Sequence, residues 1–172
     1  MHPHLTIREA TGADGERLLR FSSALREEAL PVLYRRTTPP TLESETAFIT
    51  RMLAGPSSLL LLALSGEETA GVLDVHGSAH PQRAHAVTMG ISVRAEHRRR
   101  GVARGLLQAM ARWVEAHPVV SRVELEVFAI NRPAIELYES AGFRLEGRKA
   151  GAVRIGDDLV DLLVMARRWP GK

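Results

Sequence analysis

One stretch of the sequence has the composition of an anion-binding loop. From Met89 to Gly105 it reads MGISVRAEHRRRGVARG, with apolar residues first, clustered arginines next and glycines at the end. The pattern predicts a strand that passes through a tight turn into a helix, so that unpaired backbone N–H groups converge at the positive end of the helix dipole. Gly101 and Ala103 would let a phosphate approach the backbone, and the arginines would add charge-assisted hydrogen bonds. The ligand that fits such a loop is a diphosphate.

The same arginines allow a second interpretation, a solvated basic surface or a nonspecific nucleic-acid patch. The strand before them and the glycine-led helix after them favour the phosphate loop. The loop is neither a Walker loop, because the ending Gly-Lys-Ser/Thr is absent, nor a dinucleotide fingerprint, because G-x-G-x-x-G is absent. Aromatic residues make up only 5% of the chain, which leaves few stacking platforms for single strands. A basic nucleic-acid-binding module is therefore the less favoured alternative.

A second segment, downstream of that helix, carries polar side chains on short elements. Glu124 and Glu126 alternate with apolar residues as in a strand, so both lie on one face. Asn131 is a typical N-cap of the short helix that follows. Tyr138 falls on the buried face of this helix, where a core tyrosine is the ordinary reading and a proton donor is the functional one.

The elements that must position these segments follow from the hydrophobic pattern. Alternating or continuous apolar residues predict strands at 5–7, 59–64, 70–75, 86–93, 123–127, 143–148 and 159–165. Helical spacing predicts helices from Gly15 to Pro31, from Thr41 to Gly55, from Val102 to Pro118 and from Asn131 to Gly142. In the second of these we expect a buried stripe of Leu42, Ile49, Met52 and Leu53. The order implies an α/β (α+β) fold, a mixed sheet with helices on both faces.

Length and composition narrow the class of protein. The chain has 172 residues, 45% hydrophobic and 25% charged, with a formal net charge of +3, so we expect one globular domain over residues 1–172. The absence of cysteine excludes disulfides, thiolate zinc sites and a cysteine nucleophile. The N-terminal residues lack a secretory signal, and the longest apolar run, Leu59 to Leu64, is far shorter than the roughly 20 residues of a membrane helix. We expect a cytoplasmic location and no membrane partner.

Two motifs, in order, resemble the GNAT acetyltransferases. Arg98-x-x-Gly101-x-Ala103 matches the R/Q-x-x-G-x-G/A coenzyme A loop of that family, after a strand ending in Ile-Ser-Val. Residues 125–143, LEVFAINRPAIELYESAGF, are similar to its second conserved block, L-E-V-x-x-x-N-x-x-A-I-x-L-Y-x-x-x-G-F. The resemblance covers nearly the whole chain, although residues 1–85 agree in layout rather than in motif. It implies a mostly antiparallel sheet of about seven strands with a splayed central parallel pair.

The resemblance also implies a reaction and its donor. An acetyl group would pass from acetyl-CoA to a primary amine by direct attack in a ternary complex, with no metal. The pantetheine arm would lie between the splayed strands against the backbone of Ile91 and Val93, leaving one N–H beside the thioester oxygen. Asn131 would face the cofactor, and Tyr138 would protonate the departing thiolate. The residues expected to hold the pyrophosphate or the adenosine phosphates are Arg98, Arg99, Arg100, Gly101, Val102, Ala103 and Arg104.

The proton acceptor is less defined by the sequence. An amine must be neutral to attack, so a carboxylate or a water chain has to take its proton. Glu126 is the first candidate, because it matches the glutamate that serves as base in some ribosomal-protein acetyltransferases of this family. A solvated or salt-bridged role is an equal alternative for it. The strand at 86–93 carries no carboxylate, so Asp74, His76 and His85 remain substitutes.

Metal binding is not expected. His76-x-x-x-His80, with His85 nearby, contains common ligands, but strand and turn geometry does not place them as helix-spaced ligands would be placed.

The acceptor is expected to be a free amino acid, a small amine or a protein N-terminus. Arginines could clamp its carboxylate and acids could hold its ammonium group. The segments that offer such groups are Tyr34, Arg35 and Arg36 on one side and Asp157, Asp158 and Asp161 on the other. A noncatalytic coenzyme A sensor is the alternative function, and a homodimer is compatible with such a fold.

Overall fold

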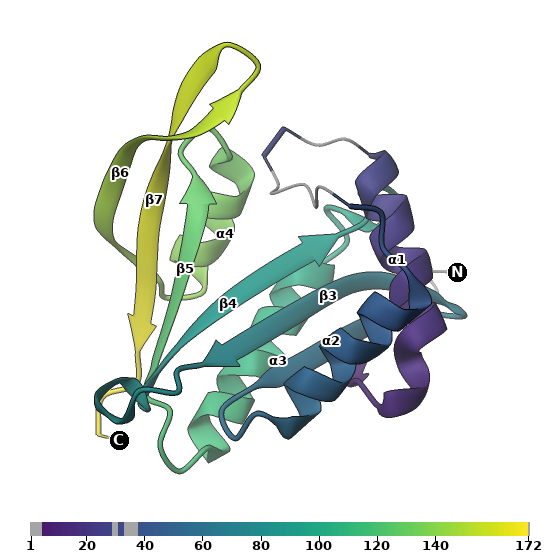
Figure 1. The fold of residues 1–172 in the computed structure, drawn as a ribbon. Helices are drawn as coiled ribbons and strands as arrows, with labels where there is room; N and C mark the ends of the chain where they lie inside the picture. Colours follow the sequence, from purple (N-terminus) through teal and green to yellow (C-terminus); the bar gives the residue numbers. More distant parts are fainter. Residues whose placement is uncertain (1–4, 29–30, 33–37, 172) are drawn as a thin grey trace.

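A computed structural model of the chain describes residues 5–28, 31–32 and 38–171. It contains one sheet of seven strands, in the order β1-β2-β3-β4-β5-β7-β6 (Figure 1). The strands are β1 (Leu5–Glu9), β2 (Leu59–Ser65), β3 (Glu68–Gly77), β4 (Ala86–Val93), β5 (Arg122–Phe128), β6 (Arg144–Ile155) and β7 (Asp158–Arg168). The α-helices are α1 (Gly15–Glu27), α2 (Leu42–Ala54), α3 (Val102–Ala116) and α4 (Arg132–Ser140).

The strands pair antiparallel except at the centre of the sheet. β4 and β5 run parallel and pair only over Ala86–Thr88 and Arg122–Glu124. Beyond these residues the two strands diverge into a V, which Figure 1 shows at the middle of the molecule. The mixed, mostly antiparallel sheet with a splayed parallel pair, predicted from the sequence, is confirmed.

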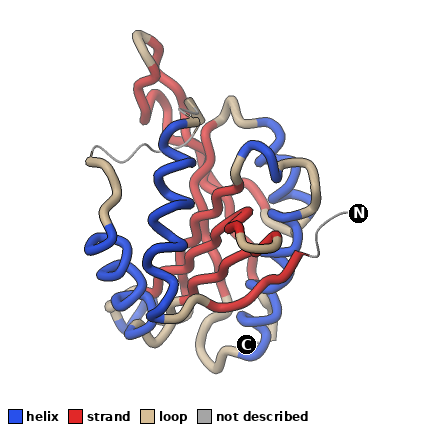
Figure 2. The backbone as a smooth tube through the Cα atoms, turned by 90° about the vertical axis from the view of Figure 1, so that its right-hand side faces the viewer, coloured by secondary structure: helices blue, strands red, loops and turns tan. Residues whose placement is uncertain are grey.

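Helices cover both faces of the sheet (Figure 2). On one face, α1 and α2 pack on side chains of β2 and β3, among them Leu60, Leu62 and Val72. On the opposite face, α3 and α4 pack on a larger apolar cluster that includes Leu73, Val123 and Phe143. We call these the α1–α2 face and the α3–α4 face. Both faces of the central strands are therefore buried, which explains why β2 reads as a continuous apolar run.

The helix α2 follows the predicted start but not the whole predicted stripe. Thr41 caps it, since its Oγ1 accepts a hydrogen bond from Ser44 N at 3.1 Å. Ile49 and Met52 are buried, whereas Leu42 and Leu53 are 45% and 53% exposed. The buried position next to Ile49 on the helix surface is taken by Glu45, which accepts a hydrogen bond from Ser22 Oγ of α1. The contact stripe is thus turned toward α1, and the two outer leucines were wrongly predicted as core.

Two further boundaries differ from prediction. α1 ends at Glu27 rather than at Pro31. The C-terminal strands continue to Ile155 and begin again at Asp158, beyond the predicted apolar segments. The extension begins with Lys149, Ala150 and Gly151, which carry little apolar side chain, and only Val153 and Ile155 alternate with exposed residues. In the described part of the chain, no helix has the length and apolar character needed to cross a membrane.

Candidate active site

The gap between β4 and β5 presents free main-chain groups. We call it the β4–β5 wedge; it begins after the last pair, Thr88 with Glu124. The Arg94 N–H donates to Ala70 O on β3 at 3.0 Å. Because main-chain groups of successive strand residues point to alternate sides, those of Ile91 and Val93 point the other way, into the wedge. This is the orientation that pairing with an extended ligand requires.

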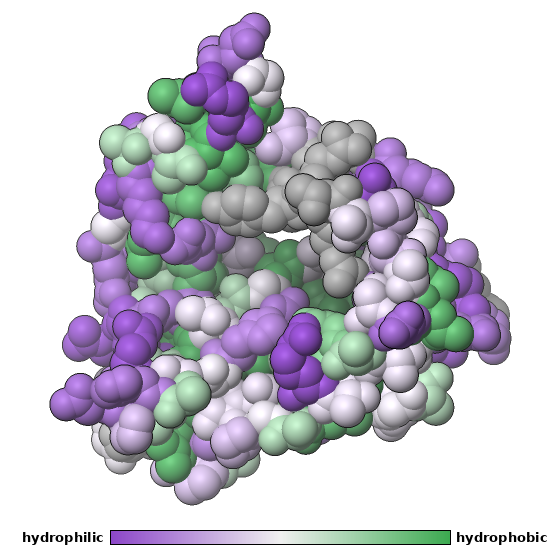
Figure 3. Space-filling model, in the orientation of Figure 1, coloured by the Kyte–Doolittle hydropathy of each residue, from purple (hydrophilic) through white to green (hydrophobic). Residues whose placement is uncertain are grey.

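At the mouth of the wedge, successive side chains of each strand lie on opposite faces of the sheet. Met89 and Leu125, the first residues beyond the last pair, are both buried on the α3–α4 face. Gly90 and Glu126 come next in each strand and therefore face the α1–α2 side. In Figure 3 this side of the molecule is hollowed, with apolar surface at the bottom and polar side chains around the rim. A ligand in the wedge would thus be reached from the α1–α2 side.

The loop between β4 and α3 has the backbone of an anion cradle. Gly101, the N-cap of α3, has φ +82° and forms no side-chain cap. The helical bonds start at Gly105 N, which donates to Gly101 O at 2.9 Å, so the N–H groups of the first helical turn have no helical partner. Arg99, with φ +61°, is the one non-glycine residue with positive φ in the described ranges. Such strained residues concentrate at ligand clamps.

Within this loop, the Arg98 side chain turns back onto the protein. Its Nε donates to Val93 O at 3.0 Å, and its Nη2 bonds to Glu28 beyond the end of α1. Arg99, Arg100 and Arg104 are exposed. Arg98 therefore fixes the loop to the end of β4, while the next two arginines and Arg104 are free to meet phosphates.

Glu28 is a residue that sequence reasoning missed. Its carboxylate accepts a hydrogen bond from Ala95 N at 2.8 Å as well as the bond from Arg98. The partners lie 67 and 70 residues away in the chain, and no local pattern around Glu28 signals the contact.

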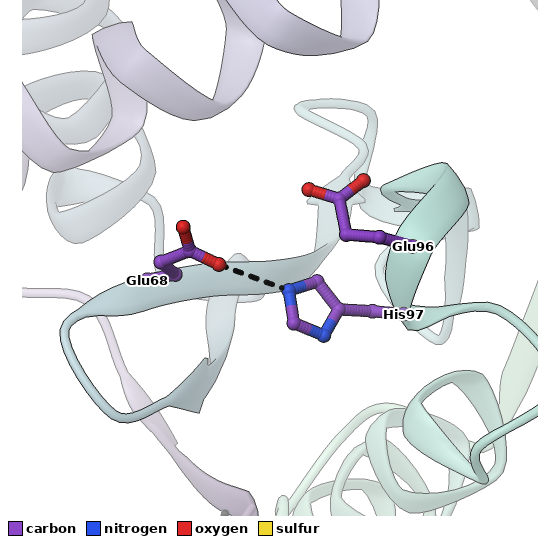
Figure 4. A group of neighbouring side chains, drawn as sticks. All are labelled: Glu68, Glu96 and His97. Carbon is purple, nitrogen blue, oxygen red and sulfur yellow. Dashed lines mark hydrogen bonds and ion pairs between the residues drawn. The ribbon is translucent and has the colours of Figure 1, made fainter.

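A second group of ionisable side chains lies beside the loop, where Glu68, Glu96 and His97 approach within 4.8 Å (Figure 4). His97 is buried and its Nε2 is 3.3 Å from Glu68 Oε2, while Glu96 forms an ion pair with Arg94. The contact of His97 with Glu68 attaches the start of β3 to the loop. His76, His80 and His85 do not gather into a metal-type cluster among the described residues.

Tyr138 lies under the wedge on α4. It is 7% exposed and belongs to the same apolar cluster as Met89 and Leu125. Its ring packs against Phe143 with centroids 5.9 Å apart. Burial raises the pKa of the Tyr138 hydroxyl to about 12, so the phenol keeps its proton at neutral pH. That is the state in which it can donate. Asn131 caps the same helix, with its Oδ1 accepting from Ala134 N at 3.3 Å.

The two strand glutamates do share a face, as the alternation predicted. Glu124 Oε1 is 2.7 Å from Arg122 Nε, and its Oε2 is 3.2 Å from Arg83. Glu126 is more exposed, and its Oε1 lies 2.5 Å from Lys149 Nζ on β6. Glu126 is therefore an ion-paired carboxylate at the rim of the site.

A third acid lies on the neighbouring strand. Asp74 of β3 pairs in register with Gly90 of β4, and both its carboxylate oxygens are 3.1 Å from the place where a Cβ on Gly90 would be. The missing side chain of Gly90 thus provides the room for this carboxylate. Asp74 Oδ2 is 2.8 Å from Nε2 of His76, so the carboxylate and the imidazole form a pair on the α1–α2 face.

The structure describes only some of the groups that were predicted to bind the acceptor. Tyr34, Arg35 and Arg36 lie outside the described residues. Asp161 is occupied, because it accepts a hydrogen bond from Gly151 N at 2.7 Å and pairs with Arg148. These bonds bridge the irregular pairing of β6 with β7 between Lys149 and Val153. Asp161 therefore shapes the hairpin. Asp157 lies in the turn at its tip, Asp158 is the first residue of β7, and both are exposed.

Comparison with known proteins agrees with this architecture. The model of the acetyltransferase (GNAT) family matches residues 23–143. The L-amino acid N-acetyltransferase AaaT of Escherichia coli (strain K12) is 32% identical over 164 residues, 95% of this chain and 97% of that protein. A GNAT-family acetyltransferase from Streptococcus pneumoniae superposes with a TM-score of 0.90 at 23% identity, over 96% of this chain and 99% of that one. The structure of yncA from Salmonella typhimurium, a putative acetyltransferase with its cofactor acetyl-CoA, has a TM-score of 0.85 at 15% identity, over 98% and 95%.

The chain that contains this wedge and this uncapped helix N-terminus therefore matches both a family model and a relative of the same class of enzyme. The chain belongs to the acetyltransferase (GNAT) family. It is an acyltransferase of the N-acetyltransferase type, and acetyl-CoA is the acetyl donor of this family. The resemblance inferred from the two motifs is confirmed.

Proposed function

We propose that this protein acetylates the primary amine of free L-amino acids, with acetyl-CoA bound in the β4–β5 wedge. The observation that carries the proposal is the wedge itself, whose free main-chain edge ends at the phosphate-type loop. The acceptor class is supported by the relative that is an L-amino acid N-acetyltransferase and is 32% identical over nearly its full length. Small amines and protein N-termini are the other acceptors with the same reacting group.

The donor is held mainly by backbone groups in this proposal. The uncapped N–H groups of Val102, Ala103 and Arg104 bind the pyrophosphate at the positive end of α3, with Arg99 and Arg100 adding charge. The main-chain groups of Ile91 and the N–H of Val93 pair with the amides of pantetheine as an added strand would, while Val93 O stays bonded to Arg98. Asn131 borders the pantetheine from the β5 side. The thioester then lies near the point where β4 and β5 separate.

The reaction is a direct transfer. The neutral amine attacks the thioester carbonyl, the C–N bond forms, and a strand N–H stabilises the oxyanion. The C–S bond then breaks, and the Tyr138 hydroxyl gives its proton to the sulfur. The nitrogen loses a proton as the amide forms, and that proton restores the tyrosine.

An amino acid arrives as an ammonium ion, so one further proton must leave before attack. The groups proposed to accept it all lie on the α1–α2 face. Glu126, predicted from the sequence, is one, acting directly or through water. The pair of Asp74 and His76 is the other.

The test is release of coenzyme A from acetyl-CoA by the purified protein, measured across L-amino acids, polyamines, aminoglycosides and short peptides. Stimulation by L-amino acids above the other classes is expected. Stimulation by another class of amine would show that the acceptor is not a free amino acid, while the acetyl transfer itself would still be supported. Silence across the whole panel, with acetyl-CoA still bound, would contradict the proposal and favour a noncatalytic coenzyme A sensor.

A further inference from the structure

The pair of His76 and Asp74 lies beside the point at which the wedge opens. In register, Asp74 is opposite Gly90 and His76 is opposite Thr88, and Thr88 is the last β4 residue paired with β5. The two side chains therefore flank, on the acceptor side of the sheet, the β4 residue at which the strands part. The inference below rests on the proposed function, because that function brings the thioester and the amine to this point.

The hydrogen bond between the two residues leaves a basic nitrogen open. Asp74 Oδ2 and His76 Nε2 are 2.8 Å apart, and a carboxylate only accepts, so Nε2 carries the proton. In the neutral imidazole Nδ1 then holds the lone pair. No described residue hydrogen-bonds to Nδ1. The His76 side chain is 43% exposed and that of Asp74 is 27% exposed, so an amine or one bridging water can reach the pair.

We infer that His76, oriented by Asp74, is the general base that deprotonates the acceptor ammonium group. One N–H bond of the ammonium breaks, its proton passes to His76 Nδ1 directly or through one water, and the electron pair stays on nitrogen for the attack on the thioester. Asp74 balances the positive charge of the resulting imidazolium. His76 later releases the proton to solvent, so one proton leaves per turnover.

The geometry favours this pair over Glu126. Glu126 is held by a lysine at 2.5 Å, and that cation competes with an incoming ammonium group for the carboxylate. Asp74 has no cationic partner besides His76 among the described residues, and its oxygens lie directly over Gly90. Gly90 is also the position at which any side chain would displace the carboxylate.

The charges around His76 set the pH range in which it works. Asp74 raises the pKa of His76 above its ordinary value of 6.5, while burial and Arg51 of α2 lower it. Phe48, also of α2, faces the ring with centroids 6.2 Å apart and is uncharged. On β4 the facing neighbour is Thr88, and beyond it on β5 is Glu124, which is already paired with Arg122 and Arg83. The base is unprotonated above its raised pKa, so activity should fall as the pH drops through that value.

The experiment compares His76→Gln with the wild type in steady-state acetyl transfer from pH 6 to pH 10, using the best acceptor of the panel. At pH 7 we expect kcat/KM to fall by roughly 10²-fold or more. The wild-type acid limb set by His76 should disappear, so that the variant regains activity only as the ammonium group loses its own proton at high pH. Asp74→Asn should give a smaller loss and move the acid limb to lower pH. Acetyl-CoA affinity and melting temperature, measured on the same samples, should stay close to wild type.

His80→Gln is the matched control, because His80 is an exposed histidine in the turn after β3, and it should leave the profile unchanged. The role of His76 is overturned if His76→Gln keeps the wild-type acid limb, and above all if Glu126→Gln removes that limb instead. In both cases the acetyl transfer of the wild type still stands. If the wild type acetylates no amine at all, the proposed function fails first, and the role of His76 fails with it.

Discussion

The Glu28 carboxylate, just beyond α1, accepts a hydrogen bond from the backbone N–H of Ala95 at 2.8 Å. Its other oxygen bonds to Arg98, whose Nε holds Val93 O at 3.0 Å. One acid thus joins the end of α1, the end of β4 and the start of the phosphate loop. Glu28 thus links the end of α1 to the loop between β4 and α3.

Glu28→Gln should therefore weaken donor binding. The variant loses charge on both hydrogen bonds, each of which is worth about 1.5–3 kcal/mol when one partner is charged. Only part of this free energy acts on the position of the loop, so we expect the Kd for acetyl-CoA to rise about tenfold, or ~1.4 kcal/mol. Calorimetry of acetyl-CoA binding measures this change. Glu27→Gln, at the exposed neighbour, is the control. Equal affinities of the two variants would show that Glu28 does not position the loop.

Gly101→Ala should damage both the fold and donor binding. At φ +82° an L-residue costs roughly 1–2 kcal/mol, although a Cβ at Gly101 would meet no atom within 4 Å. Gly156 has φ +60° and equally open space at the tip of the β6–β7 hairpin. Both alanine variants should lose a few degrees of melting temperature, but only Gly101→Ala should weaken acetyl-CoA binding, because only Gly101 lies in the loop proposed to bind the phosphates. Loss of affinity in both, or in neither, would contradict the loop assignment.

Tyr138→Phe should slow turnover while leaving the donor bound. The hydroxyl makes no hydrogen bond to the described residues, so its removal should change the melting temperature little. As a general acid it is worth roughly 10²-fold or more in kcat, with the Kd for acetyl-CoA nearly unchanged. A tyrosine that only packs in the core would leave kcat unchanged. Because its pKa is raised to about 12, no loss of activity through ionisation of Tyr138 is expected below that pH.

Asp14 should contribute acid-sensitive stability. It is 4% exposed, accepts from Thr11 N at 2.7 Å and pairs with Arg8 Nη2 at 2.6 Å, and these contacts hold its pKa well below the usual range. Since the pKa is lowered by folding, this stability is complete above the unfolded value of about 4 and is lost as the pH falls through the folded value. Asp14→Asn should cost about 2 kcal/mol at pH 7.

Melting curves from pH 7 to pH 3 check this. The gap between wild type and Asp14→Asn should narrow toward the acid end, whereas Glu16→Gln, at an exposed neighbour on α1, should track the wild type throughout. A gap that is constant with pH would mean that the Arg8 contact is not the source of the stability.

Much of the site could be predicted from local sequence. The phosphate-type loop needs only a strand, a residue that accepts positive φ at 101 and an amphipathic helix, and all three are encoded within a short stretch. The N-caps Thr41 and Asn131 and the face shared by Glu124 and Glu126 are also local, because caps and strand alternation depend on neighbours in the chain. The order of elements implied a mixed sheet, and the resemblance to the GNAT acetyltransferases implied its splayed parallel pair.

The tertiary structure decided the contacts between segments that are distant in the chain. The bond of Glu28 to Ala95, the ion pair of Glu126 with Lys149 and the burial of Glu45 in place of Leu53 depend on how helices and strands pack, which no local pattern encodes. The same is true of Asp74, whose carboxylate occupies the space left by Gly90 only because β3 and β4 pair in that register. The sequence by itself predicted the elements, the loop proposed to bind the donor and, through the resemblance, the class of reaction. The packing of β3 against β4 determined which polar groups meet at the mouth of the wedge, because register and side-chain contact are properties of the assembled sheet.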